Sequence, residues 1–257
     1  QLYNPVTIKK SEIYENYQFF ETPDGLMSVY RANPRGFYQV FVQKYSDEGQ
    51  PLWGEDGLPV DDNYVNHGNP FVLQTKDDCL IIAWVENEIA EEHPAMFYNY
   101  HSRAQKINYN GERKWGENGV IIPHSSTEDM YLQLYSDGNN GLYFSPSAYF
   151  YSSEEFELSH IDSMGNVLPM LYLPMNYYNQ VLAFNVTPQN QIVVTYDSNC
   201  EDWYSHYFMK VFDQAGNVVC PQILVGFFPD FKLFQTITTD DNHIYSFVNN
   251  GLNHIEL

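Results

Sequence analysis

The sequence predicts an all-β fold made of repeated four-stranded antiparallel units, and three observations support this prediction. One four-residue turn recurs five times along the chain. A second turn, with a different residue pattern, recurs four times. The two series alternate without exception, so one kind of strand pair is always followed by the other.

The first turn opens with Ser or Thr and closes with Gly, Asn or Asp. A Ser or Thr hydroxyl bonds the backbone just ahead of it, and the closing residues tolerate a positive φ. The turns begin at Thr22, Thr75, Ser136, Thr187 and Thr239. A short run typical of a buried strand follows each turn, in residues 26–30, 80–85, 142–144, 192–196 and 244–248. Each turn is therefore predicted to be the tip of a hairpin between two strands, A and B.

The second turn carries the signature of a type I turn, with Asp, Asn or Ser at the first position and Gly at the fourth. Its closing glycines are Gly49, Gly111, Gly165 and Gly216. The strands that enter it are expected in residues 37–44, 96–106, 156–160 and 204–211. This turn is predicted to join strands C and D.

Four antiparallel strands repeated in this way are typical of propeller blades. The predicted fold is therefore a five-bladed β-propeller that forms a single domain over residues 1–257. A β-sandwich of short strands is the alternative, but it has no reason to alternate two kinds of turn. Helical solenoids are excluded because the units lack a 3.6-residue apolar period.

The two ends of the chain each hold an incomplete unit. After the fifth A–B turn, residues 252–257 supply a candidate strand C, and no strand D follows. Residues 2–9 precede the first A strand and have no partner in their own unit. We therefore expect residues 2–9 to complete the last blade and close the ring, which removes exposed strand edges. A chain cut from a longer propeller is the alternative.

Two segments share a longer pattern: Gln-Lys, then the turn glycine, then Trp-Gly-Glu-x-Gly. They are residues 43–57 and 105–119, and they resemble a repeat of secreted bacterial β-propellers, many of which have no assigned function. In the third and fourth units Leu168-Pro169 and Val219-Cys220 replace the Trp-Gly step. The resemblance implies the fold and an exported location, and it implies no activity.

Composition excludes several classes of protein. With 12 Lys and Arg against 33 Asp and Glu, the net charge of -21 argues against a nucleic-acid partner. The longest apolar run, residues 79–85, is too short to span a bilayer. Three cysteines do not make a disulfide framework, and both a Cys200–Cys220 pair and three free thiols fit the sequence. Scarce lysine and abundant tyrosine favour an exported protein.

A binding site is expected on the face formed by the long B–C and D–A loops. These loops are acidic and aromatic, with acids such as Asp61, Glu86 and Asp197, and Arg31 and Arg35 are the exceptions in the first B–C turn. Asn16 and four of the proposed ligands stand near the starts of the A strands, where a propeller channel opens. The residues predicted to bind a ligand are Arg31, Tyr64, Asn69, Asp129, Tyr177, Asn179, Trp203 and Asp230.

The preferred functional prediction is a non-catalytic module that holds a glycan or a protein partner. The first alternative is a glycoside hydrolase-like enzyme, since five-bladed propellers host paired carboxylates; its candidate acids are Asp129, Asp230, Glu128 and Asp62. The second alternative is a structural scaffold. No nucleophile, zinc or nucleotide motif is present, so no cofactor or metal is predicted. Residues 137–141 could in principle supply oxygen ligands to calcium, but a plain hairpin turn is the preferred interpretation.

Overall fold

The computed structural model describes residues 14–34, 36–89, 98–123, 131–147, 153–178, 180–199, 205–228, 234–238, 244–249 and 255–256. The chain divides into two compact units. Unit 1 comprises Gln1–Glu128 and Met164–Val167, and unit 2 comprises Asp129–Ser163 and Leu168–Leu257. Every regular element in the described ranges is a β-strand, so the all-β prediction is confirmed. The single-domain organisation stays a prediction.

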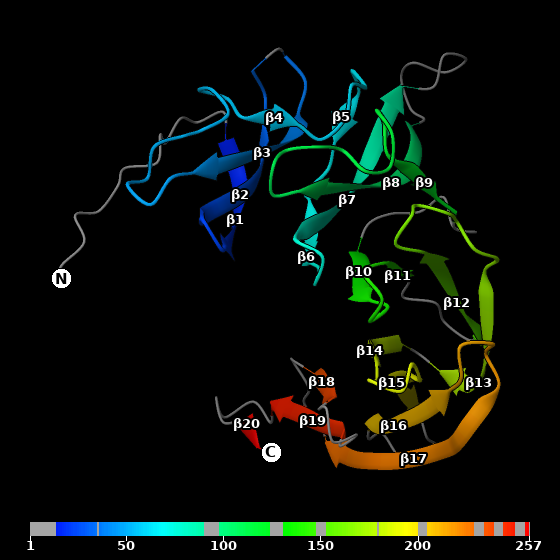
Figure 1. Cartoon of the computed structure of the whole chain (residues 1–257). Helices are drawn as coiled ribbons and strands as arrows, with labels where there is room; N and C mark the ends of the chain where they lie inside the picture. Colours follow the sequence, from blue (N-terminus) through cyan, green and yellow to red (C-terminus); the bar gives the residue numbers. More distant parts are fainter. Residues whose placement is uncertain are drawn as a thin grey trace. The chain divides into compact units, whose positions relative to one another are not determined.

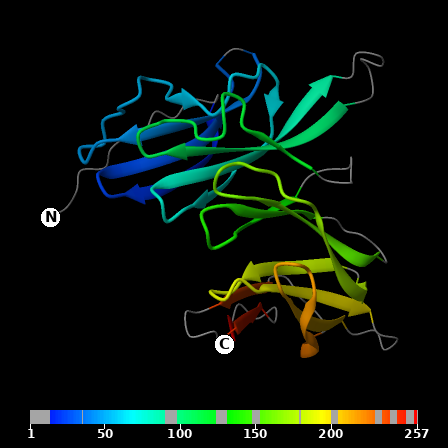
Figure 2. The same cartoon turned by 45° about the vertical axis from the view of Figure 1, so that its right-hand side comes forward.

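Unit 1 contains two antiparallel sheets (Figure 1). The first has the order β1-β2-β3-β4, with strands Tyr14–Thr22, Gly25–Ala32, Gln39–Tyr45 and Leu58–Pro59. The second contains β6 (Phe71–Gln74), β7 (Cys79–Ile89), β8 (Tyr98–Asn108) and β9 (Val120–Ile122), and Figure 2 shows β6 to β9 in cyan to green. A two-residue strand that the sequence did not predict, β5 (Asn66–His67), pairs with the far end of β7.

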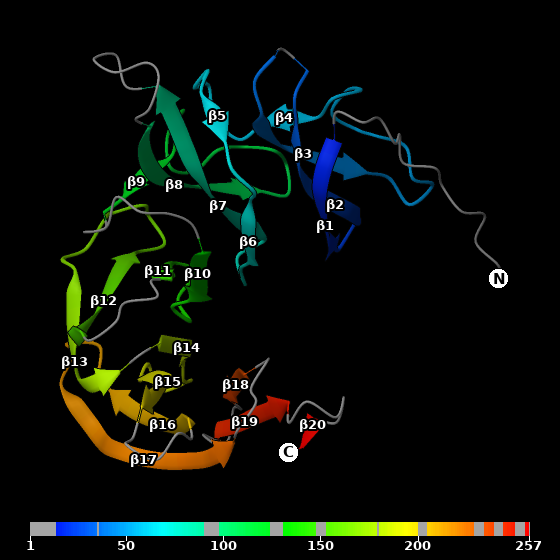
Figure 3. The same ribbon diagram turned by 180° about the vertical axis from the view of Figure 1, so that it is seen from behind.

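Unit 2 contains three antiparallel sheets, seen from behind in Figure 3. One has the order β10-β11-β12-β13, with strands Tyr131–Ser136, Leu142–Ser147, Ser153–Ile161 and Leu171–Tyr178. The next has the order β14-β15-β16-β17, with strands Gln180–Val186, Ile192–Asn199, Ser205–Phe212 and Val218–Phe228. The last has β18 (Phe234–Thr238), β19 (Ile244–Asn249) and β20 (Ile255–Glu256).

The predicted A–B hairpins are present in both units. β1 pairs with β2, β6 with β7, β10 with β11, β14 with β15 and β18 with β19, all antiparallel. The turn chemistry is as expected at Asp78 and Asn190, which adopt positive φ angles of 57° and 60°. In the third hairpin the positive φ of 67° belongs to Asn140, one residue beyond the predicted closing residue Asn139. Repeated antiparallel sheets are therefore confirmed. A closed five-bladed ring is not, since the described residues contain no closed sheet and residues 2–9 lie outside them.

One buried glutamine holds the backbone of each Trp-Gly step. The Gln105 carboxamide accepts the backbone N–H groups of Lys106 (3.0 Å) and Trp115 (3.1 Å) and donates to the Gly116 carbonyl (2.7 Å). Gln43 makes the same three bonds in the first sheet, to Lys44, Trp53 and Gly54.

Each tryptophan of the step covers the glycine of the following C–D turn. A Cβ atom at Gly111 would lie 3.2 Å from the Trp53 ring, and one at Gly165 would lie 2.6 Å from the Trp115 ring; both pairs belong to unit 1. The turn requires glycine for two reasons. The φ angles of Gly111 and Gly165 are +85° and +87°, and the tryptophan ring leaves no room for a side chain.

A cationic or histidine side chain of the C strand also reaches the A–B turn of its own sheet. Lys44 Nζ lies 2.8 Å from Asp24, Lys106 Nζ 2.7 Å from Asp77, and His160 Nε2 3.0 Å from Asp137. The other Asp137 oxygen accepts the N–H groups of Asn139 and Gly141. These contacts support the plain hairpin interpretation of residues 137–141.

Candidate functional site

Polar side chains from three segments of unit 1 meet at the starts of its A strands. The Asn69 side-chain oxygen accepts a hydrogen bond from Asn16 Nδ2 (2.6 Å) and another from Arg31 Nη1 (2.9 Å). The Arg31 guanidinium lies 3.9 Å from the centre of the Tyr38 ring, within cation–π range. We call Asn16, Arg31, Tyr38 and Asn69 the polar edge. Its amides and guanidinium offer the hydrogen-bonding groups that a sugar or another polyhydroxy ligand uses.

Local backbone geometry presents Asn16 to this edge. Asn16 has a φ of 56° and lies where the β1–β2 register shifts between Glu15 and Gln18. Asparagine tolerates this conformation better than most residues, and a bulge of this kind redirects a side chain.

The connection between the two sheets of unit 1 holds Asn69 in place. His67 N–H donates to the Tyr38 carbonyl (2.8 Å), and Gly68 N–H donates to the Val85 carbonyl (2.7 Å). Tyr38 N–H donates in turn to the Asn66 side chain (3.0 Å). The backbone just before Asn69 is therefore tied to β3 on one side and to β7 on the other.

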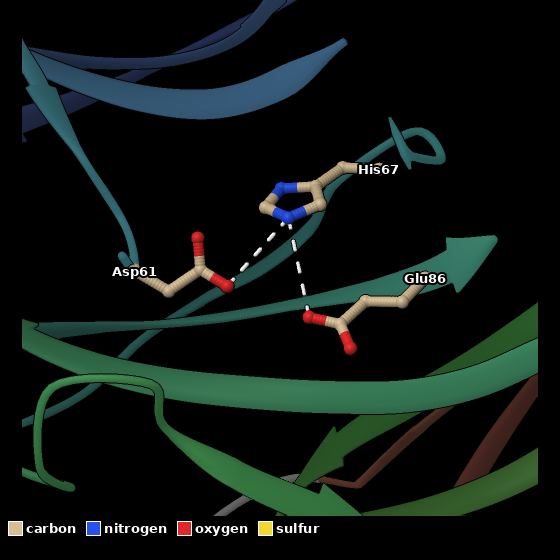
Figure 4. Close-up of side chains that lie close together, drawn as sticks. All are labelled: Asp61, His67 and Glu86. Atoms are coloured by element: carbon tan, nitrogen blue, oxygen red, sulfur yellow. Dashed lines mark ion pairs between the residues drawn. The ribbon is translucent and has the colours of Figure 1, made fainter. Parts of the chain in front are cut away.

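Directly behind this connection lies a group of buried titratable residues (Figure 4). His67 Nε2 lies 3.6 Å from Asp61 Oδ2 and 4.0 Å from Glu86 Oε1. The three side chains are at most 1% exposed. We call Asp61, His67 and Glu86 the buried cluster.

The members of the buried cluster differ in their partners. Glu86 forms an ion pair with Arg103 (2.7 Å) and accepts a hydrogen bond from Asn63 (3.2 Å). Neither Asp61 oxygen has a hydrogen-bond partner. Burial, and then the Glu86 charge, raise the pKa of Asp61 to about 7. Burial, and then the charges of Arg103 and Arg31, lower the pKa of His67 to about 3.

The residue types of the buried cluster suit a metal ion, but the histidine tautomer does not. Their ligand atoms lie within 4.8 Å of one another. However, His67 Nδ1 accepts the N–H of Val40 at 3.1 Å, so the proton of the neutral ring is on Nε2. A metal at Nε2 requires that nitrogen to be unprotonated, with its proton on Nδ1. The cluster therefore fits a proton-sharing arrangement better than a metal centre.

The structure brings together two of the predicted ligand residues, Asn69 and Arg31. Tyr64 is 70% exposed and lies edge-on to Phe37, with ring centres 5.9 Å apart. Asp62 is held by Arg113 at 3.0 Å. Tyr177 lies within β13 and not in a loop. The remaining predicted residues lie outside the described ranges: Glu128, Asp129, Asn179, Trp203 and Asp230.

Two residues predicted for loops lie in strands, and Asp61, which does lie in a loop, is buried. Glu86 lies in β7 because that strand runs four residues further than the apolar run suggested, and it is buried together with Asp61. Arg31 lies in β2. The role of Glu86 had a signal in the sequence: Leu80, Ile82 and Trp84 precede it at alternate positions, so all four share one sheet face.

No family model matches the chain, and no curated protein matches it. Solved structures do. A thermostable family-43 glycoside hydrolase has a TM-score of 0.43 at 11% identity, covering 81% of this chain and 75% of that one. A xylan β-1,4-xylosidase from Bacillus halodurans C-125 has a TM-score of 0.43 at 8% identity, and the match covers 94% of this chain and 50% of that one. A GH32 β-fructofuranosidase from Bombyx mori has a TM-score of 0.42 at 11% identity, and the match covers 92% of this chain and 54% of that one. These neighbours are all glycoside hydrolases.

The prediction of a non-catalytic binding module is contradicted by these neighbours, which agree with the glycoside hydrolase-like alternative. The likeness is one of general architecture, and at these scores it carries no active-site residue over to this chain. Within the described residues, no helix has the length and apolarity needed to cross a membrane.

Proposed function

We propose that the protein is a glycoside hydrolase-like enzyme that binds a glycan at the starts of its A strands. The observation that carries the proposal is the polar edge, where Arg31 and Asn16 fix the orientation of the Asn69 carboxamide. With its oxygen held by these two donors, the exposed Asn69 carboxamide offers its NH₂ group as the donor for a sugar hydroxyl. Such pre-oriented polar groups give a binding site its specificity.

The residues proposed for catalysis stand at corresponding positions of other repeats in the sequence. Asp129 and Asp230 stand near the start of an A strand, as Asn16 and Asn69 do. One carboxylic acid would protonate the leaving-group oxygen, and one carboxylate would act as nucleophile or as base toward water. Glu128 and Asp62 are the proposed supporting acids. The exposed Tyr64 ring offers an apolar face for a further sugar residue.

We further propose that the sheets are blades of a five-bladed β-propeller closed by residues 2–9 beside residues 252–257. The repeated hairpins and the Trp-on-glycine contacts support a repeat of blades. The resemblance to secreted propeller repeats supports an exported location.

Product analysis on a panel of plant, microbial and host glycans tests the activity. We expect wild type to release oligosaccharides from at least one of them. Asp129→Asn and Asp230→Asn should each lower the rate by about 10²–10⁴-fold, as expected for loss of acid–base or nucleophilic chemistry. Asn69→Ala should lower kcat/KM by about tenfold, the loss of one hydrogen bond of ~1.4 kcal/mol.

Asp47→Asn is the matched control, because it makes the same change at an exposed site in a C–D turn. It should behave as wild type. Glycan binding without any product would contradict the enzymatic proposal. Unchanged products from both Asp129→Asn and Asp230→Asn would exclude these acids.

A further inference from the structure

Asp61 is the least satisfied ionisable group among the described residues. Its side chain is 0% exposed, and both of its oxygens lack a hydrogen-bond partner. A buried carboxylate in that state is far more costly than a buried neutral carboxylic acid. Its protonation state therefore matters to the stability of unit 1.

The charges that face Asp61 come from four other places in unit 1. Glu86 on β7 and Asp62 next to Asp61 are acidic, while Arg103 on β8 and Arg113 before β9 are basic. Arg103 is 2.7 Å from Glu86, and Arg113 is 3.0 Å from Asp62. Two guanidinium groups thus neutralise two carboxylates, and Asp61 is the third carboxyl group.

His67, which faces Asp61 from β5, does not supply the missing positive charge. Its Nδ1 lone pair is taken by the Val40 N–H, so a second ring proton would displace that hydrogen bond. Val40 N–H is a buried backbone donor and would be left without a partner. Asp61 and the five charged or titratable side chains around it are together electrically neutral only when Asp61 keeps its proton.

We propose that Asp61 is a buried proton-binding site that locks the connection between the two sheets of unit 1 when protonated and loosens it when ionised. The raised pKa of Asp61, about 7, agrees with this assignment. Compared with the ordinary value of 3.8, the folded unit holds this proton about 10³-fold more tightly than an exposed aspartate does.

The direction of the pH effect follows from this difference. Between about pH 4 and pH 7 the folded unit binds the proton and the unfolded chain does not, so stability falls as pH rises through this range. Above pH 7 both states are ionised, and the effect levels off. The connection that loosens contains His67 and leads to Asn69, so the device acts on the polar edge whatever ligand the edge takes.

Thermal unfolding from pH 5 to 9 tests the proposal with one variant at Asp61 and one matched control. Asp61→Asn replaces the proton-bearing group with a neutral group of the same shape. We expect its midpoint to stay nearly level across this range and to exceed that of wild type at pH 8.5. Asp47→Asn makes the same change at an exposed turn residue whose charge does not act on Asp61, and it should keep the wild-type slope.

Two measurements on the wild type keep the test independent of how the variant folds. Carboxyl-carbon NMR should show one Asp side chain titrating near pH 7. Amide exchange at Val40 and His67, corrected for the intrinsic effect of pH, should speed up by at least about tenfold from pH 5.5 to pH 8.5. An ordinary titration midpoint for every Asp, or the same pH slope in wild type and Asp61→Asn, would overturn the proposal. Stabilisation of wild type by Zn²⁺, reversed by a chelator and absent in Asp61→Asn, would replace the proton with a metal.

Discussion

At the scale of single residues, buried glutamines explain why the repeat keeps its Gln-Lys and Trp-Gly positions together. Gln43 and Gln105 each tie a C strand to the segment that leaves the C–D turn, through three hydrogen bonds. No shorter polar side chain spans this gap. The Gln-Lys and Trp-Gly positions, about ten residues apart, are therefore joined by the glutamine side chain.

Gln105→Ala removes all three bonds and leaves two buried backbone N–H groups without their acceptor. We expect a loss of about 2–4 kcal/mol in the free energy of unfolding. Urea denaturation measures it, with the exposed Gln50→Ala as control. Gln43→Ala should cost a similar amount, and a loss below 1 kcal/mol in both would contradict this role.

The last glycine of the Trp-Gly-Glu-x-Gly pattern is also fixed by its surroundings. A Cβ at Gly119 would lie 2.3 Å from the Ala104 carbonyl oxygen, whereas one at Gly116 meets nothing within 4 Å. Both residues have a positive φ, so alanine costs each about 1–2 kcal/mol in strain. Gly119→Ala should cost about 1–3 kcal/mol more than Gly116→Ala because the strands must separate. Equal midpoints in urea would contradict this account of the motif.

At the scale of elements, the hairpin is the part of the fold that the sequence predicts best. Its turns are decided within four residues by backbone preference, and Asp78 and Asn190 adopt the expected positive φ, while Asn140 does so one residue later than predicted. The strand ends are less predictable, because they depend on partners far along the chain. β7 continues to Ile89 since β8 pairs with it over its whole length.

The tie between the C strand and the A–B turn makes each hairpin sensitive to acid. Burial alone would raise the pKa of Asp137, but bonds from His160 and the turn N–H groups outweigh it and lower the pKa. The stabilisation is present above the ordinary aspartate pKa and is lost as pH falls below about 4. Asp137→Asn should therefore destabilise by about 1 kcal/mol at pH 7 and by less near pH 3. Denaturation at both pH values checks this, and an equal difference at both would contradict it.

At the scale of the whole molecule, the repeat pattern predicted antiparallel sheets, and it did not predict the buried cluster. Asp61 was predicted to be a loop acid because nothing near it in sequence indicates burial. Glu86 was predicted to be one because it follows the end of the apolar run, although its alternation with Trp84 indicates the buried face. Their burial depends on β5 pairing with the end of β7, a contact between distant segments. The polar edge was partly predictable, since Asn16 and Asn69 were placed at the strand starts and Arg31 was proposed from the first B–C turn. The prediction of a non-catalytic module was wrong because the fold alone does not distinguish binding from catalysis.

Closure of the proposed propeller depends on residues 2–9. Replacing residues 6–8 with Gly-Ser-Gly keeps the chain length but removes the strand-forming side chains. We expect the unfolding midpoint to drop by roughly 4–8 °C, for a loss of about 2 kcal/mol, and aggregation to increase as a strand edge is exposed. The same replacement within residues 47–50, an exposed turn, controls for the general effect of introducing Gly-Ser-Gly. An unchanged midpoint would argue against closure by this segment.

The central claim, that paired carboxylates at the starts of A strands cleave a glycosidic bond, has one direct structural test. It is the separation of the Asp129 and Asp230 carboxyl groups in an experimental structure. We predict a separation of about 5–10 Å, the range in which two acids act on one bond. Carboxyl groups much farther apart, or directed away from each other, would contradict the claim.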